Sequence, residues 1–137
     1  MESRIAEVEI TDNSDEILSR MDSTIEVALE KIGLAAEGYA KRLCRVVTGR
    51  LRNSITHATA TYPGVGTYED NEGNVFDDAT ADGTPEKNTV YIGTNVEYAP
   101  YVELGTSRTS ARPYLKPAVV DHAAQYKKIF EDSMKDA

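Results

Sequence analysis

The sequence of 137 residues contains no tryptophan, only two phenylalanines and a single cysteine, Cys44. One cysteine excludes a disulfide within the chain and a metal site built from several thiolates. Cys44 lies in an apolar helical pattern, which favours a buried, inert thiol over a nucleophile. No run of about 18 apolar residues occurs, and the first residues lack the basic and then apolar layout of a signal peptide. We therefore expect a cytosolic protein with no membrane partner.

Cations are scarce relative to acids: 15 lysines and arginines against 23 aspartates and glutamates give a net charge of −8. Nucleic-acid binding is driven by neutralisation of phosphates, so this chain is a poor general candidate for it. Acidity is typical of simple solubility, and it also suits a channel through which DNA passes without sticking. The length fits one domain over residues 1–137.

Recognisable catalytic motifs are also missing, including GxSxG, HExxH, CxxC and the phosphate-binding loop. The two histidines, His57 and His122, fall on different predicted elements. No nucleophile or orienting acid is spaced to form a catalytic set with either of them. We therefore predict no enzyme activity, no cofactor and no bound metal.

A long helix is predicted over residues 14–47, because apolar residues recur there at steps of three and four. Asn13 can cap its start, and Gly49 is a natural stop. Residues 1–12 alternate loosely between acidic and apolar, which predicts an edge strand or an N-terminal arm that reaches a neighbour. The apolar positions of the helix are Leu18, Met21, Ile25, Ala28, Ile32, Ala35, Tyr39, Leu43 and Val46.

Two strands are predicted over residues 54–62 and 88–94, both rich in β-branched residues. Between them, residues 64–87 form an acidic tract, for which we predict a mobile loop or a hairpin around Glu72-Gly73. The spacing of its acids lacks the ligand pattern of an EF-hand, so no calcium site is predicted. The candidate acidic residues of this loop are Glu69, Asp70, Glu72, Asp77, Asp78 and Asp82.

The C-terminal part predicts a short helix over residues 98–104, with Pro100 in its first turn, then a polar linker and a last helix starting at Pro113 or Pro117. The predicted fold class is α+β. A long N-terminal helix and a C-terminal helix pack on one face of a small, mainly antiparallel sheet.

Two surfaces are candidates for docking. Tyr98, Tyr101 and Leu104 are spaced by three, so they share one helix face, which packs either on the chain's own sheet or on a partner. Arg112 can brace Glu103 or a helix end. A basic patch close to the end of the long helix either complements the helix C-terminus or contacts an acidic partner or DNA. It consists of Lys41, Arg42, Arg45, Arg50 and Arg52.

Three segments together resemble a known family. They are TGRLRNSI at residues 48–55, YAPYVELGT at 98–106 and ARPYLKPA at 111–118. This order of motifs resembles the small tail-completion proteins of long-tailed bacteriophages, also described as head–tail joining, minor connector or tail-terminator proteins. The matching positions are Thr48, Gly49, Leu51, Ser54, Ile55, Tyr98, Ala99, Tyr101, Val102, Glu103, Gly105, Thr106, Arg112, Pro113, Tyr114, Leu115, Pro117 and Ala118.

The resemblance implies a homo-oligomeric ring, expected to be a hexamer, at the head-proximal end of a phage tail. Its expected partners are further copies of itself, the tail-tube protein and the head-connector protein, with DNA only as cargo. It would be assembled in the bacterial cytoplasm and reside at the head–tail junction of the virion. A head-side connector protein and a DNA-binding protein that uses the basic patch remain alternatives. The expected contact residues are Tyr98, Tyr101, Val102, Leu104, Arg112 and Tyr114.

Overall fold

The computed structural model describes residues 14–81 and 83–135. The predicted N-terminal arm, its neighbour Asn13 and the acidic residue Asp82 lie outside these ranges. The predicted α+β architecture is confirmed: a long N-terminal helix and a C-terminal helical segment pack against small antiparallel two-stranded sheets.

The predicted long helix is α1, Ser14–Leu43, and it ends before the predicted limit at Val47. The residues that follow include Val46 and Val47, whose β-branched side chains are less favourable in a helix. Gly49, with a φ of 86°, starts the short helix α2, Arg50–Ser54, so its predicted role as the stop of α1 is wrong.

The central sheet has two strands. β1, Thr56–Thr59, pairs antiparallel with β4, Val90–Gly93, so that Thr56 lies opposite Gly93 and Thr59 opposite Val90. β1 is shorter than the predicted strand because Ser54 belongs to α2, where its hydroxyl lies 2.6 Å from the Leu51 carbonyl oxygen.

The acidic tract forms the predicted hairpin. β2, Gly66–Glu69, pairs antiparallel with β3, Val75–Ala79, in a sheet of its own. The turn between them meets the start of α2, where the Asn71 amide donates to the Thr48 carbonyl oxygen at 2.6 Å. A Cβ at Gly49 would lie 2.6 Å from the Asn71 side chain, so only glycine permits this close approach.

The C-terminal region contains three helices: α3, Ala99–Leu104, α4, Leu115–Val120, and α5, Ala123–Lys135. The single last helix that we predicted is therefore divided at residues 121–122. At this break the His122 ring stacks on Tyr39 of α1, with centroids 3.5 Å apart and planes 2° from parallel.

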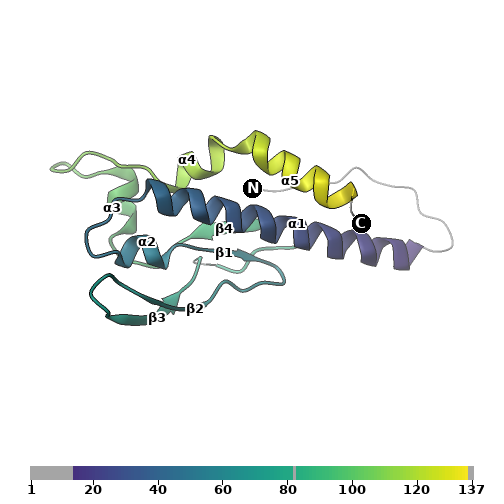
Figure 1. Cartoon of the computed structure of the whole chain (residues 1–137), viewed down its shortest axis with the longest axis horizontal. Helices are drawn as coiled ribbons and strands as arrows, with labels where there is room; N and C mark the ends of the chain where they lie inside the picture. The colour runs from purple at the N-terminus through teal and green to yellow at the C-terminus, as the bar shows by residue number, and fades with distance from the viewer. Residues whose placement is uncertain (1–13, 82, 136–137) are drawn as a thin grey trace.

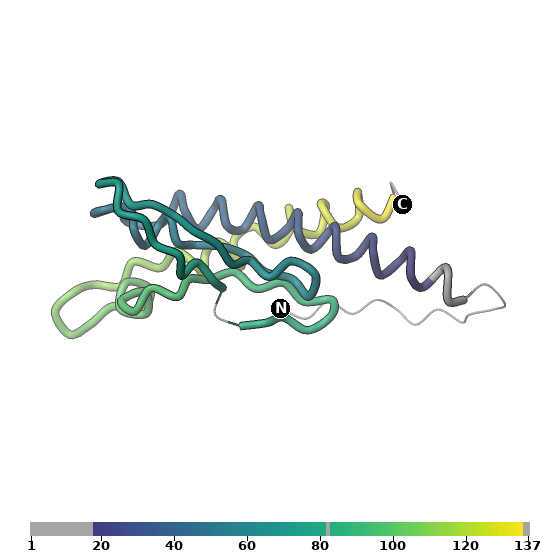
Figure 2. The backbone as a smooth tube through the Cα atoms, turned by 90° about the horizontal axis from the view of Figure 1, so that it is seen from below, coloured from purple at the N-terminus to yellow at the C-terminus, as the bar shows by residue number. Residues whose placement is uncertain are grey.

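The helices and the central sheet form two layers. α1 and α5 lie side by side, and β1 and β4 lie against them on one side (Figures 1 and 2). α3 and the loop that follows it lie at the end of the molecule where α1 finishes, whereas the start of α1 lies at the opposite end (Figure 1). The two ends therefore carry different segments of the chain.

Two apolar clusters form the core. The first joins the end of α1 to α2, α3 and α4, and the second joins the middle of α1 to α5 and β4. Buried members of the first cluster are Ala40, Cys44, Leu51, Ile55, Val96, Ala99, Tyr114 and Ala118. The second has Ile32, Ala36 and Tyr126 at its centre.

Candidate assembly interface

The three motif segments, far apart in the sequence, meet at one end of the molecule. Leu51 and Ile55 of the first, Ala99 of the second and Tyr114 and Ala118 of the third belong to one buried cluster. The motif residues therefore build a single packed unit around the last turns of α1. Their side chains that are not in this cluster decide what the unit presents to a partner.

The predicted contact face on α3 divides into a buried and an exposed half. Tyr98 and Val102 are half-buried and pack against the first cluster. Tyr101 and Leu104 face outward, with 62% and 78% of their surface exposed. These two large apolar side chains are spaced by three and so share one face of α3.

Tyr114 is not part of the exposed surface. It is fully buried in the first cluster, and burial raises the pKa of its hydroxyl. In this conformation Tyr114 therefore contributes no exposed surface to the contact face, and its role at an interface stays a prediction. The aromatic ring fills the space between α4 and the end of α1 and stabilises the unit from inside.

Glu103 orders the segment after α3. Its carboxylate accepts hydrogen bonds from the backbone amides of Tyr114, Leu115 and Lys116, at 3.0, 2.8 and 3.3 Å. These amides at the start of α4 have no partner within the helix, so the carboxylate satisfies them and complements the helix dipole. We expected Arg112 to brace Glu103, but the backbone of α4 takes this place and Arg112 is exposed.

The basic patch is less uniform than its sequence suggests. Lys41 forms an ion pair with Glu37 at 3.3 Å, and Arg52 donates to the Asn71 side chain at 3.1 Å. The Arg42 guanidinium lies over the Tyr39 ring, 5.2 Å from its centroid.

Arg50 connects the hairpin to the rest of the molecule. Its guanidinium lies 3.3 Å from Glu97 and 3.8 Å from Asp78, and 4.5 Å above the centroid of Phe76. Asp78 and Phe76 belong to β3, so this arginine acts within the chain. Of the five predicted patch residues, Arg45 alone is exposed with no side-chain partner among residues 14–81 and 83–135.

The acidic residues of the hairpin also have different roles. Asp70 is buried, and its Oδ1 accepts from the amides of Glu72 and Asn74, each at 2.9 Å. Its Oδ2 accepts from the Asn74 side chain, and these hydrogen bonds lower the pKa of the carboxyl. Asp70 thus closes the turn of the hairpin. The side chains of Glu69, Glu72 and Asp77 are exposed.

A hollow lies between the exposed part of α3 and the segment after α1. It consists of two adjoining cavities of about 210 and 230 Å³, which share Arg45, Tyr98 and Val102. Val47, 81% exposed, lines one cavity, and Tyr101 and Arg112 line the other. We call this site the arginine hollow. It brings together four predicted contact residues of the motif segments and two residues of the basic patch, Arg45 and Arg50.

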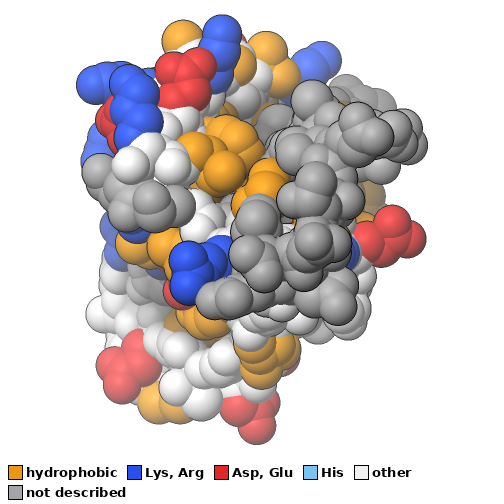
Figure 3. Space-filling model, turned by 90° about the vertical axis from the view of Figure 1, so that its right-hand side faces the viewer, with side chains coloured by type: hydrophobic (Ala, Val, Ile, Leu, Met, Phe, Trp, Pro, Cys, Tyr) orange, Lys and Arg blue, Asp and Glu red, His pale blue; other side chains and the backbone are white. Residues whose placement is uncertain are grey.

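The opposite end of the molecule also presents apolar surface. Viewed from the end where α1 begins, several hydrophobic side chains are visible among charged and other ones (Figure 3). Leu18, in the first part of α1, has 38% of its surface exposed. Apolar surface is therefore available at both ends of the long axis.

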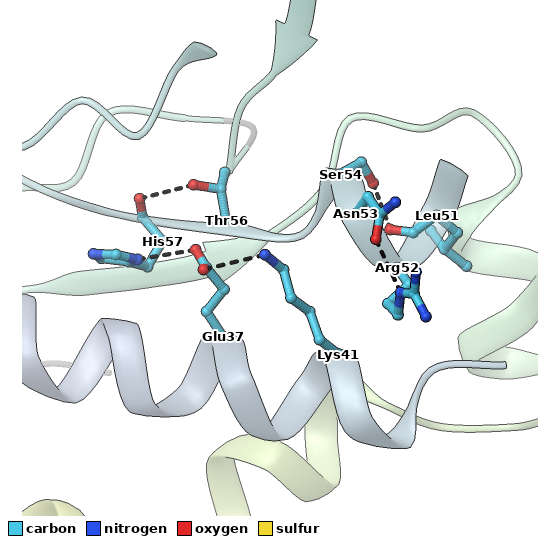
Figure 4. A network of polar contacts seen from close by, with 8 residues as sticks. All are labelled: Glu37, Lys41, Leu51, Arg52, Asn53, Ser54, Thr56 and His57. Atoms are coloured by element: carbon cyan, nitrogen blue, oxygen red, sulfur yellow. Dashed lines mark hydrogen bonds and ion pairs between the residues drawn. The ribbon is translucent and has the colours of Figure 1, made fainter. Parts of the chain in front are cut away.

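Sequence reasoning missed a polar contact between α1 and β1. Glu37 points from α1 toward His57 on β1, and Glu37 Oε1 lies 3.1 Å from His57 Nδ1 (Figure 4). His57 is buried against Gly33, where an added Cβ would lie 2.7 Å from the ring. The sequence signals for this contact were Gly33 within the predicted helix and His57 within the predicted strand.

The contact makes stability depend on pH. Burial alone would raise the pKa of the Glu37 carboxyl, but the hydrogen bond from His57 and the charge of Lys41 outweigh it and hold the pKa below its ordinary value. A carboxyl with a lowered folded pKa stabilises the fold above its unfolded pKa, and this contribution is lost as pH falls through the folded pKa. Wild-type protein should therefore lose more stability than Glu37→Gln as the pH falls from 7 to about 3, with most of the difference arising below the ordinary glutamate pKa of about 4.3.

Urea unfolding of both proteins across this pH range measures the difference. A parallel decline of the two unfolding free energies would contradict a stabilising Glu37 carboxylate. Every other carboxyl is common to both proteins, so the difference reports the Glu37 carboxylate together with its contact to His57.

The remaining titratable candidates do not converge. Cys44 is buried, and burial raises the pKa of its thiol to about 11. His57 and His122 lie on different elements, in contact with Glu37 and Tyr39 respectively. Among the described residues, no three histidine, cysteine, aspartate or glutamate side chains are placed to hold a metal ion. No described helix combines the length and the apolar character needed to cross a lipid bilayer.

Comparisons with protein-family models, with curated proteins and with solved structures found no match. The functional interpretation therefore rests on the motifs and on the geometry described above.

Proposed function

We propose that this protein is a structural assembly protein of a tailed bacteriophage. It forms a homo-oligomeric ring, expected to be a hexamer, at the head-proximal end of the tail. The ring completes the tail and joins it to the head connector, and DNA passes through it as cargo. Its role is binding and assembly, without catalysis, at the head–tail junction of the virion.

One observation carries this proposal: the three motif segments form one packed unit that leaves apolar side chains exposed. Tyr101, Leu104 and Val47 have between 62% and 81% of their surface exposed at one end of the molecule. Exposed large apolar side chains that cluster mark protein–protein contact sites. At the opposite end, Leu18 in the first part of α1 is exposed. A head-to-tail contact joins two different surfaces of the chain, and such contacts form a ring when the rotation between neighbouring copies closes.

The exposed acids of the hairpin fit the same proposal. Glu69, Glu72 and Asp77 are exposed, and a surface of carboxylates facing a lumen repels the DNA backbone, so DNA slides without sticking. The alternative is that the protein belongs to the connector on the head side, where it would use the same surfaces. The DNA-binding alternative has less support, because Lys41 and Arg50 pair with acids of the chain itself.

The proposal is tested in the phage that encodes the protein. Deleting the gene should leave filled heads and tails that lack the ring, unjoined in electron micrographs, and a plasmid-borne wild-type copy should restore joined particles. Light scattering of the purified chain should show association above the monomer mass of 15.0 kDa as concentration rises. Normal joined virions from the deletion would contradict the proposal. Duplex DNA binding at about 150 mM salt, abolished by Arg42→Glu with Arg45→Glu, would favour the DNA-binding alternative.

A further inference from the structure

The arginine hollow has the chemistry of a peptide-binding site. Arg45 and Arg112 are exposed on its rim, and neither has an acidic partner among residues 14–81 and 83–135. Val47, Tyr98 and Val102 give its walls aliphatic and aromatic surface, and small hydroxyl side chains line much of the rest: Thr48, Thr106, Thr109 and Ser110. The two adjoining apolar cavities can accept small aliphatic side chains, and the two guanidiniums can pair with carboxylates. The site therefore fits a segment in which these two kinds of side chain alternate.

Residues 1–12 have this composition. They contain Glu2, Glu7, Glu9 and Asp12 against a single Arg4, and so carry a net charge of −3. Val8 and Ile10 alternate with Glu7 and Glu9. Few other stretches of the chain combine aliphatic side chains with carboxylates in direct alternation. Charge and side-chain size therefore complement the arginine hollow.

We propose that the arginine hollow binds residues 5–10 of a second copy of this chain. Val8 and Ile10 occupy the two cavities, and Glu7 and Glu9 pair with Arg45 and Arg112. This inference rests on the self-association in the proposed function and names the contact that produces it.

The reach of the segment excludes the same copy as the donor. Residues 14–43 form α1, whose 30 residues span about 45 Å at 1.5 Å per residue. The lining of the arginine hollow begins at Arg45, just after the end of α1 at Leu43, whereas residues 5–10 precede Ser14 in the sequence. Ile5 is nine residues from Ser14, a distance of at most about 32 Å in extended chain. A donor at one end and an acceptor at the other is the head-to-tail arrangement.

Disulfide trapping between two full-length variants tests the contact. Val8→Cys in one copy and Val47→Cys in the other, each with a different tag, are mixed under mild oxidation. We expect a cross-linked species of twice the chain mass. It should be about tenfold more abundant than the cross-linked species from a control mixture of Val8→Cys and Val27→Cys copies. Val27 is a matched control, because it is an exposed valine of α1 outside the arginine hollow. The native Cys44 does not compete, since it is buried.

Charge exchange adds specificity to the test. Arg45→Glu with Arg112→Glu in the Val47→Cys copy should reduce the cross-link about tenfold. Glu7→Arg with Glu9→Arg in the Val8→Cys copy should restore the cross-link to the acceptor that carries Arg45→Glu and Arg112→Glu. An acceptor that had only misfolded would not regain the cross-link. A single chain carrying both cysteines should cross-link between copies only, and a disulfide within one copy would overturn the assignment to a second copy.

Failure of this inference is distinguishable from failure of the proposed function. Association in light scattering without enrichment of the Val8–Val47 cross-link would overturn the arginine hollow as the acceptor and leave the ring intact. A chain that stays monomeric at all concentrations and is dispensable for particle joining would overturn both.

Discussion

Replacing Tyr114 with alanine is expected to lower the free energy of unfolding by about 3–5 kcal/mol. Tyr114 is fully buried in the first core cluster, between the end of α1 and the helices α3 and α4. Removal of the ring leaves a cavity and takes apolar surface out of contact with Leu51 and Ala118. Chemical denaturation followed by circular dichroism measures the loss.

Tyr101→Ala is the matched control, because it removes the same side chain from an exposed position of the neighbouring motif helix. Its effect on the unfolding free energy should stay within about 0.5 kcal/mol. A Tyr114→Ala protein as stable as wild type, with impaired assembly, would instead return Tyr114 to the partner-binding surface predicted from sequence.

The local parts of the fold could be predicted from the sequence. The long helix follows from apolar steps of three and four, and the hairpin from the acidic, glycine-containing turn at Glu72-Gly73. The short helix α3 follows from Pro100 in its first turn and from Gly105 directly after its last residue. Each of these signals acts within a few residues, so the sequence contains it directly.

The contacts that decide the site act between distant residues. Glu103 serves the start of α4 and not Arg112, and Asp70 is used within its own turn. The exposure of Tyr98, Tyr101 and Tyr114 depends on how α3 and α4 pack on α1. The spacing of apolar residues in the sequence does not predict this packing. The same motif therefore contains both a core residue and exposed ones, and only the packing separates them.

The basic patch illustrates the same limit. Five cations within twelve residues predicted a single positive surface. In the folded chain, Arg50 meets Asp78 of β3 and Lys41 meets Glu37, so much of the charge is neutralised internally. Arg45 remains, and it lines the same cavity as Arg112, which belongs to the motif segment at residues 111–118.

Replacing both Tyr101 and Leu104 with aspartate should abolish self-association and head–tail joining while leaving the fold unchanged. Both side chains are mostly exposed in the single chain, so the carboxylates meet water there and cost little. At a contact between subunits, the same carboxylates would be buried without partners. We expect the concentration needed for association to rise about a hundredfold, equivalent to about 2.8 kcal/mol.

Val27→Asp is the control, because it places a carboxylate at an exposed valine of α1, away from α3. This variant should associate and join particles as wild type does. Light scattering gives the association, circular dichroism the fold, and complementation of the gene deletion the joining. Unfolding of the Tyr101→Asp, Leu104→Asp protein would show that the face belongs to the core. A folded variant that still joins heads to tails would show that the partner-binding surface lies elsewhere on the molecule.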